Sequence, residues 1–224
     1  SVLDYLIKHS NGFASLSSLR ISFDEPVGVN DALSLEFEHS ADEIRFTLYS
    51  QARRVVHGRM KIGAAFNASF SMPQLGKEKQ CKDLRQEELL GKSGAIPLAL
   101  DPHLFSVLFP NLSKSFNARQ VAILLATTRL VGMECPGLHS IFGGIKMTFD
   151  IQDESDTELK YRVSSWHPNY RMLQIQIENS GTTGIIDCFF RPEPIDQASS
   201  NSLRCAVIPG EFAAQRALIV GGAR

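Results

Sequence analysis

The sequence contains few cysteines, and they follow no pattern. Cys81, Cys135, Cys188 and Cys205 lie far apart and form neither a CxxC pair nor another spacing that suits metal ligands. This distribution argues against a metal site built from cysteine and histidine. It is typical of reduced thiols in a cytoplasmic protein, so we expect the protein in the cytoplasm and without a bound metal.

Long apolar runs and an excess of one charge are also missing. No stretch of about 18 apolar residues occurs, so we expect no membrane span, and the first residues lack the pattern of a signal peptide. The net charge is -1, which gives no sign of a nucleic-acid or anionic-membrane partner. The 224 residues are 43% hydrophobic, which is enough for one large domain or two small ones.

Residues 117–150 predict one buried helix followed by one long strand. Residues 121–131 are apolar in nearly every direction around a helix, which is typical of a buried one. Asn117 is a suitable N-cap, and Gln120 forms part of a capping box with it. Gly132 predicts the end of the helix, and Pro136-Gly137 predicts a turn before the strand.

Alternating apolar and polar residues predict two antiparallel sets of four strands. The predicted strands are residues 16–27, 31–40, 43–50 and 54–66 before the central helix, and 140–150, 158–165, 171–178 and 184–190 after it. Residues 1–8 predict a short helix, residues 79–90 an exposed helix within a polar linker, and residues 95–100 a further strand. Residues 101–115 are expected to be irregular.

The two sets of strands indicate an internal repeat. Residues 21–24 (ISFD) match residues 147–150 (MTFD), and a helix and a turn precede each set. One such unit leaves sheet edges and a helix uncovered, so two are expected to pack together. We predict a first unit at 1–70 without its N-terminal part, a linker at 71–94 and a second unit at 95–192. A second linker is expected at 193–216.

The motifs CPGLHSIFGGIKMTFD and SLRISFDEPVGVND resemble the MaoC-like double-hotdog hydratases. In that group a helix, a Pro-Gly turn and a strand ending in an aromatic and an acidic residue follow one another. The resemblance covers residues 1–192. It implies an α+β fold, a double hotdog in which two antiparallel sheets each wrap around a central helix with pseudo-dimeric symmetry. It also implies either a monomer of this kind or a homodimer of such monomers.

The same resemblance implies chemistry on an acyl thioester of coenzyme A or acyl carrier protein. The group adds or removes water across the 2,3 double bond, using a signature similar to S-G-D-x-N-P-x-H. This signature is absent here, and its nearest remnant is Asp101-Pro102-His103, where the acid and the histidine stand closer than the family pattern requires. Either the protein uses another arrangement of catalytic groups, or it has lost the reaction.

Residues 217–224 (ALIVGGAR) resemble the first strand and glycine-rich turn of a short-chain dehydrogenase/reductase. Glycines in such a turn let the backbone approach a pyrophosphate. The resemblance implies a reductase domain downstream that uses NAD(P). The residues present do not complete such a site, so we expect no cofactor within them.

Three residues are candidates for catalysis and four for substrate binding. The catalytic candidates are His103, Asp101 and His139, as general acids or bases; the binding candidates are Asn117, Ser140, Gly143 and Gly144. Several of them have a structural alternative: Asp101-Pro102 is an ordinary turn, His139 a hydrogen-bonded residue at a strand start, Asn117 an ordinary helix cap, and Gly143-Gly144 a bulge.

Three hypotheses for function follow. The first is a dehydratase or hydratase module, or as a variant a thioesterase, fused to a reductase. The second is a non-catalytic module that holds an acyl chain or supports dimerisation. The third is a shared fold that binds another small acid or a polyketide.

Overall fold

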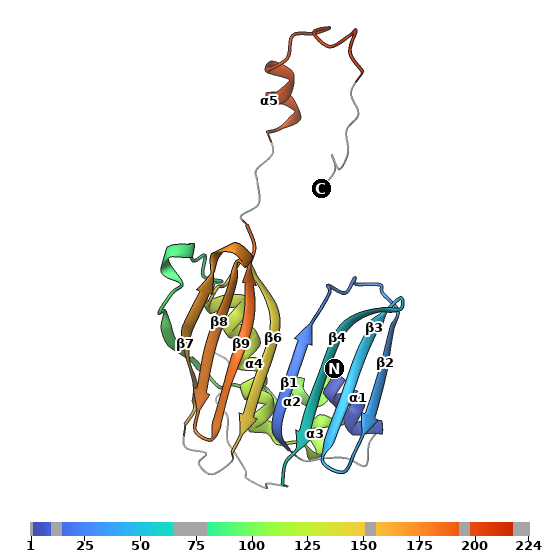
Figure 1. Cartoon of the computed structure of the whole chain (residues 1–224), viewed down its shortest axis with the longest axis vertical. Helices are drawn as coiled ribbons and strands as arrows, with labels where there is room; N and C mark the ends of the chain where they lie inside the picture. Colours follow the sequence, from blue (N-terminus) through green and yellow to red (C-terminus); the bar gives the residue numbers. More distant parts are fainter. Residues whose placement is uncertain (1, 10–14, 65–79, 151–155, 193–197, 217–224) are drawn as a thin grey trace. The chain divides into compact units, whose positions relative to one another are not determined.

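The computed structural model describes residues 2–9, 15–64, 80–150, 156–192 and 198–216 (Figure 1). The chain divides into two compact units, Ser1–Arg191 and Pro192–Arg224. In the second unit, helix α5 (Ser200–Cys205) is capped by Ser199, whose hydroxyl accepts a hydrogen bond from the Ser202 amide. This helix lies in the stretch predicted as a linker.

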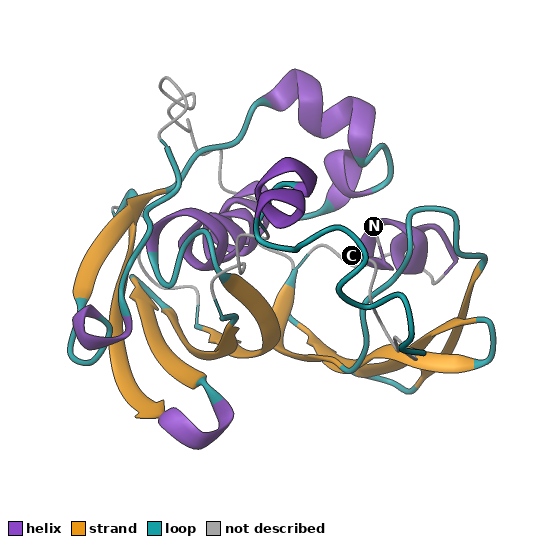
Figure 2. Cartoon of the chain, turned by 90° about the horizontal axis from the view of Figure 1, so that it is seen from above, coloured by secondary structure: helices purple, strands orange, loops and turns teal. Residues whose placement is uncertain are grey.

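The first unit consists of one antiparallel sheet and a small set of helices. The strands are β1 (Leu16–Phe23), β2 (Leu33–His39), β3 (Glu43–Ser50), β4 (Arg53–Ile62), β5 (Ser93–Pro97), β6 (Ser140–Phe149), β7 (Glu158–His167), β8 (Met172–Asn179) and β9 (Thr182–Phe190). Their order in the sheet is β2-β3-β4-β1-β6-β9-β8-β7-β5. Figure 2 shows the sheet curving around helices that lie against its concave face.

The helices are more numerous than the sequence predicts. They are α1 (Val2–His9), α2 (Pro102–Leu108), α3 (Leu112–Ser115) and α4 (Ala118–Arg129), with a π-helical turn η2 (Leu130–Glu134) and the 3-10 turns η1 (Gln86–Glu88) and η3 (Pro168–Tyr170). The central helix α4 and the leading helix α1 stand where the sequence predicts helices.

The internal repeat is confirmed by the strand order. Strands β1, β2, β3 and β4 take the same places in the first half as β6, β7, β8 and β9 in the second, and the halves join through β1 and β6. Gly58 stands opposite Ile21, and Gly184 stands opposite the matching residue Met147. Repeated glycines at equivalent positions support a true repeat rather than a chance similarity between strand meanders.

Strand β5 has no counterpart among the described residues of the first half. In the second half β5 pairs with β7, where Leu159 is fully buried. The equivalent outer strand of the first half, β2, has an open edge, and its residue Leu33 is 51% exposed. The outer edge of β2 is therefore not covered by any strand of the described residues.

Gln120, near the start of α4, connects the helix to the first half. Gln120 is buried, and its side chain accepts from the Leu16 amide at 2.8 Å and donates to the Leu16 carbonyl at 2.7 Å. Asn117 caps the helix by accepting from the Gln120 amide at 3.1 Å. The capping-box prediction is therefore right for Asn117 and wrong for the Gln120 side chain, which binds β1 instead.

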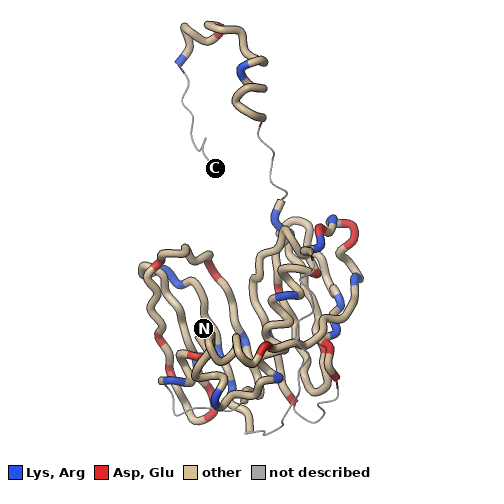
Figure 3. Tube along the Cα trace, turned by 180° about the vertical axis from the view of Figure 1, so that it is seen from behind, with Lys and Arg blue, Asp and Glu red and all other residues tan. Residues whose placement is uncertain are grey.

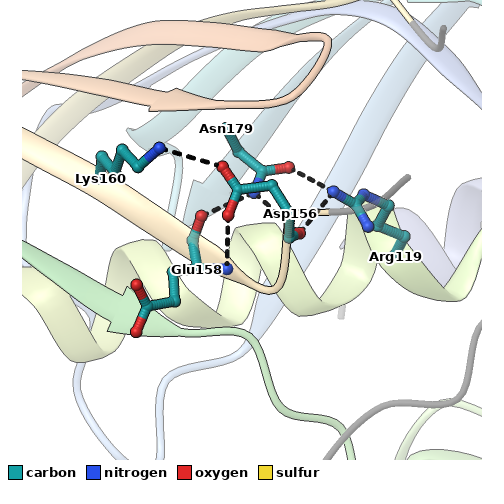
Figure 4. Close-up of polar contacts among 5 residues, drawn as sticks. All are labelled: Arg119, Asp156, Glu158, Lys160 and Asn179. Atoms are coloured by element: carbon teal, nitrogen blue, oxygen red, sulfur yellow. Dashed lines mark hydrogen bonds and ion pairs between the residues drawn. The ribbon is translucent and has the colours of Figure 1, made fainter. Parts of the chain in front are cut away.

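On its other side, α4 is fixed to the second half by Arg119 (Figure 4). The buried guanidinium donates to the Asp156 carbonyl at 2.6 Å and to the Asn179 side-chain oxygen at 2.8 Å. The Asn179 amide group in turn donates to the Glu158 carbonyl at 2.6 Å. These contacts satisfy backbone groups at the start of β7, so the cluster connects the central helix with the β7–β8 hairpin.

Three local predictions are wrong. Helical structure does not end at Gly132 but continues through η2 to Glu134, because the Cys135 and Gly137 amides donate to the carbonyls of Leu130 and Val131. The exposed helix at 79–90 is reduced to the single turn η1 in the described part. Residues 101–115 are not irregular: Asp101 caps α2, with Pro102 at its first position, and α3 follows.

Candidate functional site

A cavity of about 640 Å³ lies between the two halves, bounded by the sheet and by both α1 and α4. Its wall is formed by Val2, Leu3, Leu19, Ile21, Phe23, Phe46, Leu48, Val56, Leu124, Thr127, Thr128, Val131, Gly132, Ser140, Phe142 and Ile145. The first half contributes α1, β1, β3 and β4, and the second contributes α4, η2 and β6. The repeat therefore creates the cavity, since neither half encloses it alone.

The cavity is almost purely apolar. None of the described residues that form its wall has an ionisable side chain. The hydroxyls of Thr127 and Thr128 donate to the backbone of their own helix, at Leu124 and Leu125. Within the described structure, the Ser140 hydroxyl makes no hydrogen bond, so it is the polar group that remains for a ligand.

His139 lies in the turn before β6 and directly precedes Ser140, a residue of the cavity wall. Gly137 takes a left-handed conformation (φ 86°) and packs against the Lys82 carbonyl, as the Pro136-Gly137 prediction requires. The His139 side chain is 12% exposed, with Nε2 3.5 Å from an Asp83 carboxylate oxygen. Its ring also contacts Phe190 edge-on, at 6.2 Å between centroids. His139 thus has an acidic partner that the sequence analysis did not find, because Asp83 lies in the polar stretch taken as a linker.

Asp101 and His103 lie elsewhere. The Asp101 carboxylate accepts from the Leu104 amide at 2.9 Å as the cap of α2, and the His103 side chain is exposed on that helix. Neither residue lines the cavity, and the described structure contains no hydrogen bond or ion pair between them, or between either of them and His139. The structure therefore does not bring together the three residues proposed for catalysis.

The four residues proposed for substrate binding are not brought together either. Ser140 lines the cavity, whereas Asn117 caps α4 and does not. Gly143 and Gly144 form a bulge where β6 shifts register against β9. A Cβ on Gly143 would meet the Phe189 ring at 2.6 Å, so this glycine accommodates a neighbouring side chain.

The buried thiols are unsuited to nucleophilic chemistry. Cys135 and Cys188 are free and fully buried. Burial raises the pKa of Cys135 to about 11 and raises that of Cys188 further. Both thiols are therefore protonated at neutral pH, when only a thiolate attacks a thioester efficiently.

Sequence analysis missed most residues of the cavity. Leu124 was taken as part of a buried helix, and Ile21 and Phe142 only as parts of predicted strands. Only an indirect feature of the sequence could have indicated these residues. The repeat predicts an interface between two central helices, and a cavity forms where the side chains at that interface do not fill the space.

The described part of the chain contains no helix long and apolar enough to cross a membrane. It also contains no cluster of residues that would hold a metal ion. Residues 217–224, which resemble a dinucleotide-binding turn, lie outside the described residues, so the NAD(P) prediction stays untested.

No protein-family model matches the chain, and no curated protein is recognisably similar to it in sequence. Solved structures do match. A MaoC-like dehydratase superposes with a TM-score of 0.50 at 9% identity, covering 84% of this chain and 80% of that one. A hot dog protein from Alicyclobacillus acidocaldarius gives 0.47 at 11% identity, with 86% and 84% covered. The tesB protein of Mycobacterium avium subspecies paratuberculosis gives 0.46 at 13%, with 84% of each chain covered.

At such low identity these similarities concern the fold alone. The two repeated halves, each with strands curved around a helix, agree with the dehydratase over most of both chains. The predicted pair of sheets is present as two halves of one continuous sheet. The chain has an α+β double-hotdog fold.

Proposed function

We propose that this chain binds an acyl thioester and holds the acyl chain in the cavity between its two halves. The observation that supports the proposal is the cavity wall, which offers apolar side chains and a single uncommitted hydroxyl. Such a wall favours a hydrocarbon chain, because each buried methylene contributes about 0.8 kcal/mol. The Ser140 hydroxyl is suited to donate to the one polar part of such a ligand, the thioester carbonyl.

Chain length provides the first test. We expect the affinity for S-acyl-pantetheine to rise about two- to fourfold per methylene from butanoyl to octanoyl, and then to level off when the cavity is filled. Leu124→Trp, which fills the cavity from α4, should weaken binding of the octanoyl ligand at least tenfold. Isothermal titration calorimetry measures both effects.

The matched control is Leu90→Trp, the same replacement at a residue that is 65% exposed and outside the cavity. It should bind like the wild type. Equal affinity for butanoyl and octanoyl ligands, or equal loss in both tryptophan variants, would contradict an acyl-binding cavity.

A second candidate function is hydration or dehydration of the bound thioester. The observation that favours it is the His139–Asp83 pair, because Asp83 can orient the imidazole while His139 moves a proton. In the hydration direction the hydroxyl of water bonds to C3 of a 2-enoyl thioester, and C2 receives a proton. His139 precedes Ser140 of the cavity wall, so its backbone adjoins the site that we propose for the thioester.

If this chemistry occurs, His139→Ala should lower kcat/KM for 2-octenoyl-CoA hydration at least about 100-fold. The assay follows the loss of the conjugated thioester absorbance. His103→Ala serves as the control and should retain full activity, since His103 is exposed on α2. Absence of turnover in the wild type would refute the hydratase function and leave the binding function to be judged by the titrations.

A further inference from the structure

Four basic residues face one another across four neighbouring strands. Arg45 stands opposite Arg59, Arg59 opposite Arg20, and Arg20 opposite Lys146. All four side chains are exposed, on the sheet face opposite the helices, because the neighbouring residues Leu19 and Ile21 line the cavity on the other face. We call Arg45, Arg59, Arg20 and Lys146 the basic row.

This arrangement is unfavourable in the protein alone. Like charges that stand directly opposite on paired strands destabilise a sheet. In the described structure, Arg20, Arg59 and Lys146 form no ion pair, whereas Arg45 binds Glu43 at 2.7 Å. The nearby arginines Arg53 and Arg54 are different, since each pairs with an acidic residue at 2.9 Å. Within the described structure, the charges of Arg20, Arg59 and Lys146 are thus available to an external anion.

Part of the basic row lines a surface hollow of about 420 Å³. Its wall includes the three arginines Arg20, Arg45 and Arg59, with Ser22, Thr47 and His57 beside them. Ser22 and Thr47 both stand opposite His57, and their hydroxyls make no hydrogen bond to the described residues. His57 binds Asp24, which also pairs with Arg54. Guanidinium groups and free hydroxyls together are donors suited to phosphate oxygens.

From this geometry we infer that the hollow binds a small organic polyphosphate with at least two phosphate groups. Its size lies in the range of about 300–1,000 Å³ that small-molecule sites occupy. A single phosphate would meet only part of a row that crosses four strands. A free nucleoside polyphosphate and the phosphate-bearing end of a coenzyme share this chemistry, and either source satisfies the inference.

A polynucleotide fits this face less well. Glu38 stands opposite Arg45, and Glu43 binds it, so acidic side chains limit the basic row at its β2 and β3 end. Figure 3 shows acidic and basic residues interspersed along the chain. The net charge of -1 agrees with a local anion site.

Calorimetric titration of the full chain with ATP, coenzyme A, inorganic tripolyphosphate and orthophosphate tests the inference. We expect the polyphosphates to bind more tightly than orthophosphate, with affinity that falls as salt is added. Arg59→Gln and Arg20→Gln should each weaken polyphosphate binding about tenfold or more, because a hydrogen bond to a charged group is lost. Tighter binding of ATP or of coenzyme A identifies the source.

Two control variants show whether polyphosphate binding is specific to this hollow. Arg162→Gln removes an exposed charge from the other half of the sheet, and Leu124→Trp fills the acyl cavity; both should keep wild-type polyphosphate affinity. Urea unfolding should show that Arg59→Gln is at least as stable as the wild type, since a repulsion is removed. No polyphosphate binding, an equal loss in Arg162→Gln, or tighter binding of an oligothymidylate than of ATP would overturn the inference.

Discussion

Replacing Gln120 by alanine is expected to lower the free energy of unfolding by about 2–6 kcal/mol. The variant loses two hydrogen bonds to the Leu16 backbone and leaves the amide and the carbonyl of that residue buried without a partner. Each unsatisfied backbone group costs about 1–3 kcal/mol. Urea denaturation, with an unchanged dependence on denaturant, measures the loss.

The control is Gln176→Ala, at an exposed glutamine on β8 whose side chain forms no hydrogen bond within the described structure. Its stability should change by less than about 0.5 kcal/mol. If Gln120→Ala lowered the free energy of unfolding as little as this control, the bridge between the central helix and β1 would not hold the two halves together as described.

Alanine at Gly58 or Gly184 is expected to destabilise the fold by about 3 kcal/mol. A Cβ on Gly58 would meet the Arg20 carbonyl and the Phe46 ring, each at 2.6 Å; on Gly184 it would meet the Lys146 carbonyl at 2.7 Å. A backbone carbonyl cannot rotate away, so β1 and β4, or β6 and β9, must separate. This overpacking lies at the upper end of the usual range of about 1–3 kcal/mol.

Gly132→Ala is the matched control for both variants. Gly132 lies in the helical turn η2, and a Cβ there would meet nothing within 4 Å. Alanine should therefore be neutral or stabilise the protein by up to about 1 kcal/mol. Thermal and urea unfolding of the three variants check the prediction; similar stability in all three would contradict the close strand pairing that defines the repeat.

Residue patterns predicted most elements of the fold because their signals are local. The four strands on each side of the central helix alternate clearly, and Pro136-Gly137 marks its turn. The helix end was mispredicted, because carbonyls in η2 are satisfied by the later residues Cys135 and Gly137. Similarly, the Gln120 side chain binds Leu16, a residue distant in sequence, and no local pattern shows this.

The candidate site was less predictable for a physical reason. The remnant of the family signature indicated Asp101 and His103, but in the fold Asp101 caps a helix and His103 is exposed on the surface. His139 was singled out as a strand-start residue, but its partner Asp83 became visible only in three dimensions. An apolar cavity has no motif, because its residues resemble those of any core.

The cavity and the basic row lie on opposite faces of the sheet. Binding of an acyl chain to the cavity can therefore be distinguished from binding of a polyphosphate to the basic row. An acyl chain binds by burial and should be insensitive to salt, whereas a polyphosphate binds by charge and should be sensitive to it. Pantetheine thioesters carry no phosphate and therefore report on the cavity alone. This separation lets either proposal fail without affecting the other.

The most direct test of the central claim is a crystal structure of the chain with a pantetheine thioether whose eight-carbon chain carries a ketone, which mimics the thioester but resists hydrolysis. We predict that the acyl chain lies between α4 and β1, against Leu124, Ile21 and Phe142, with the ketone oxygen near Ser140. An empty cavity at a saturating ligand concentration, or an acyl chain bound on another surface, would contradict an acyl-binding cavity between the two halves.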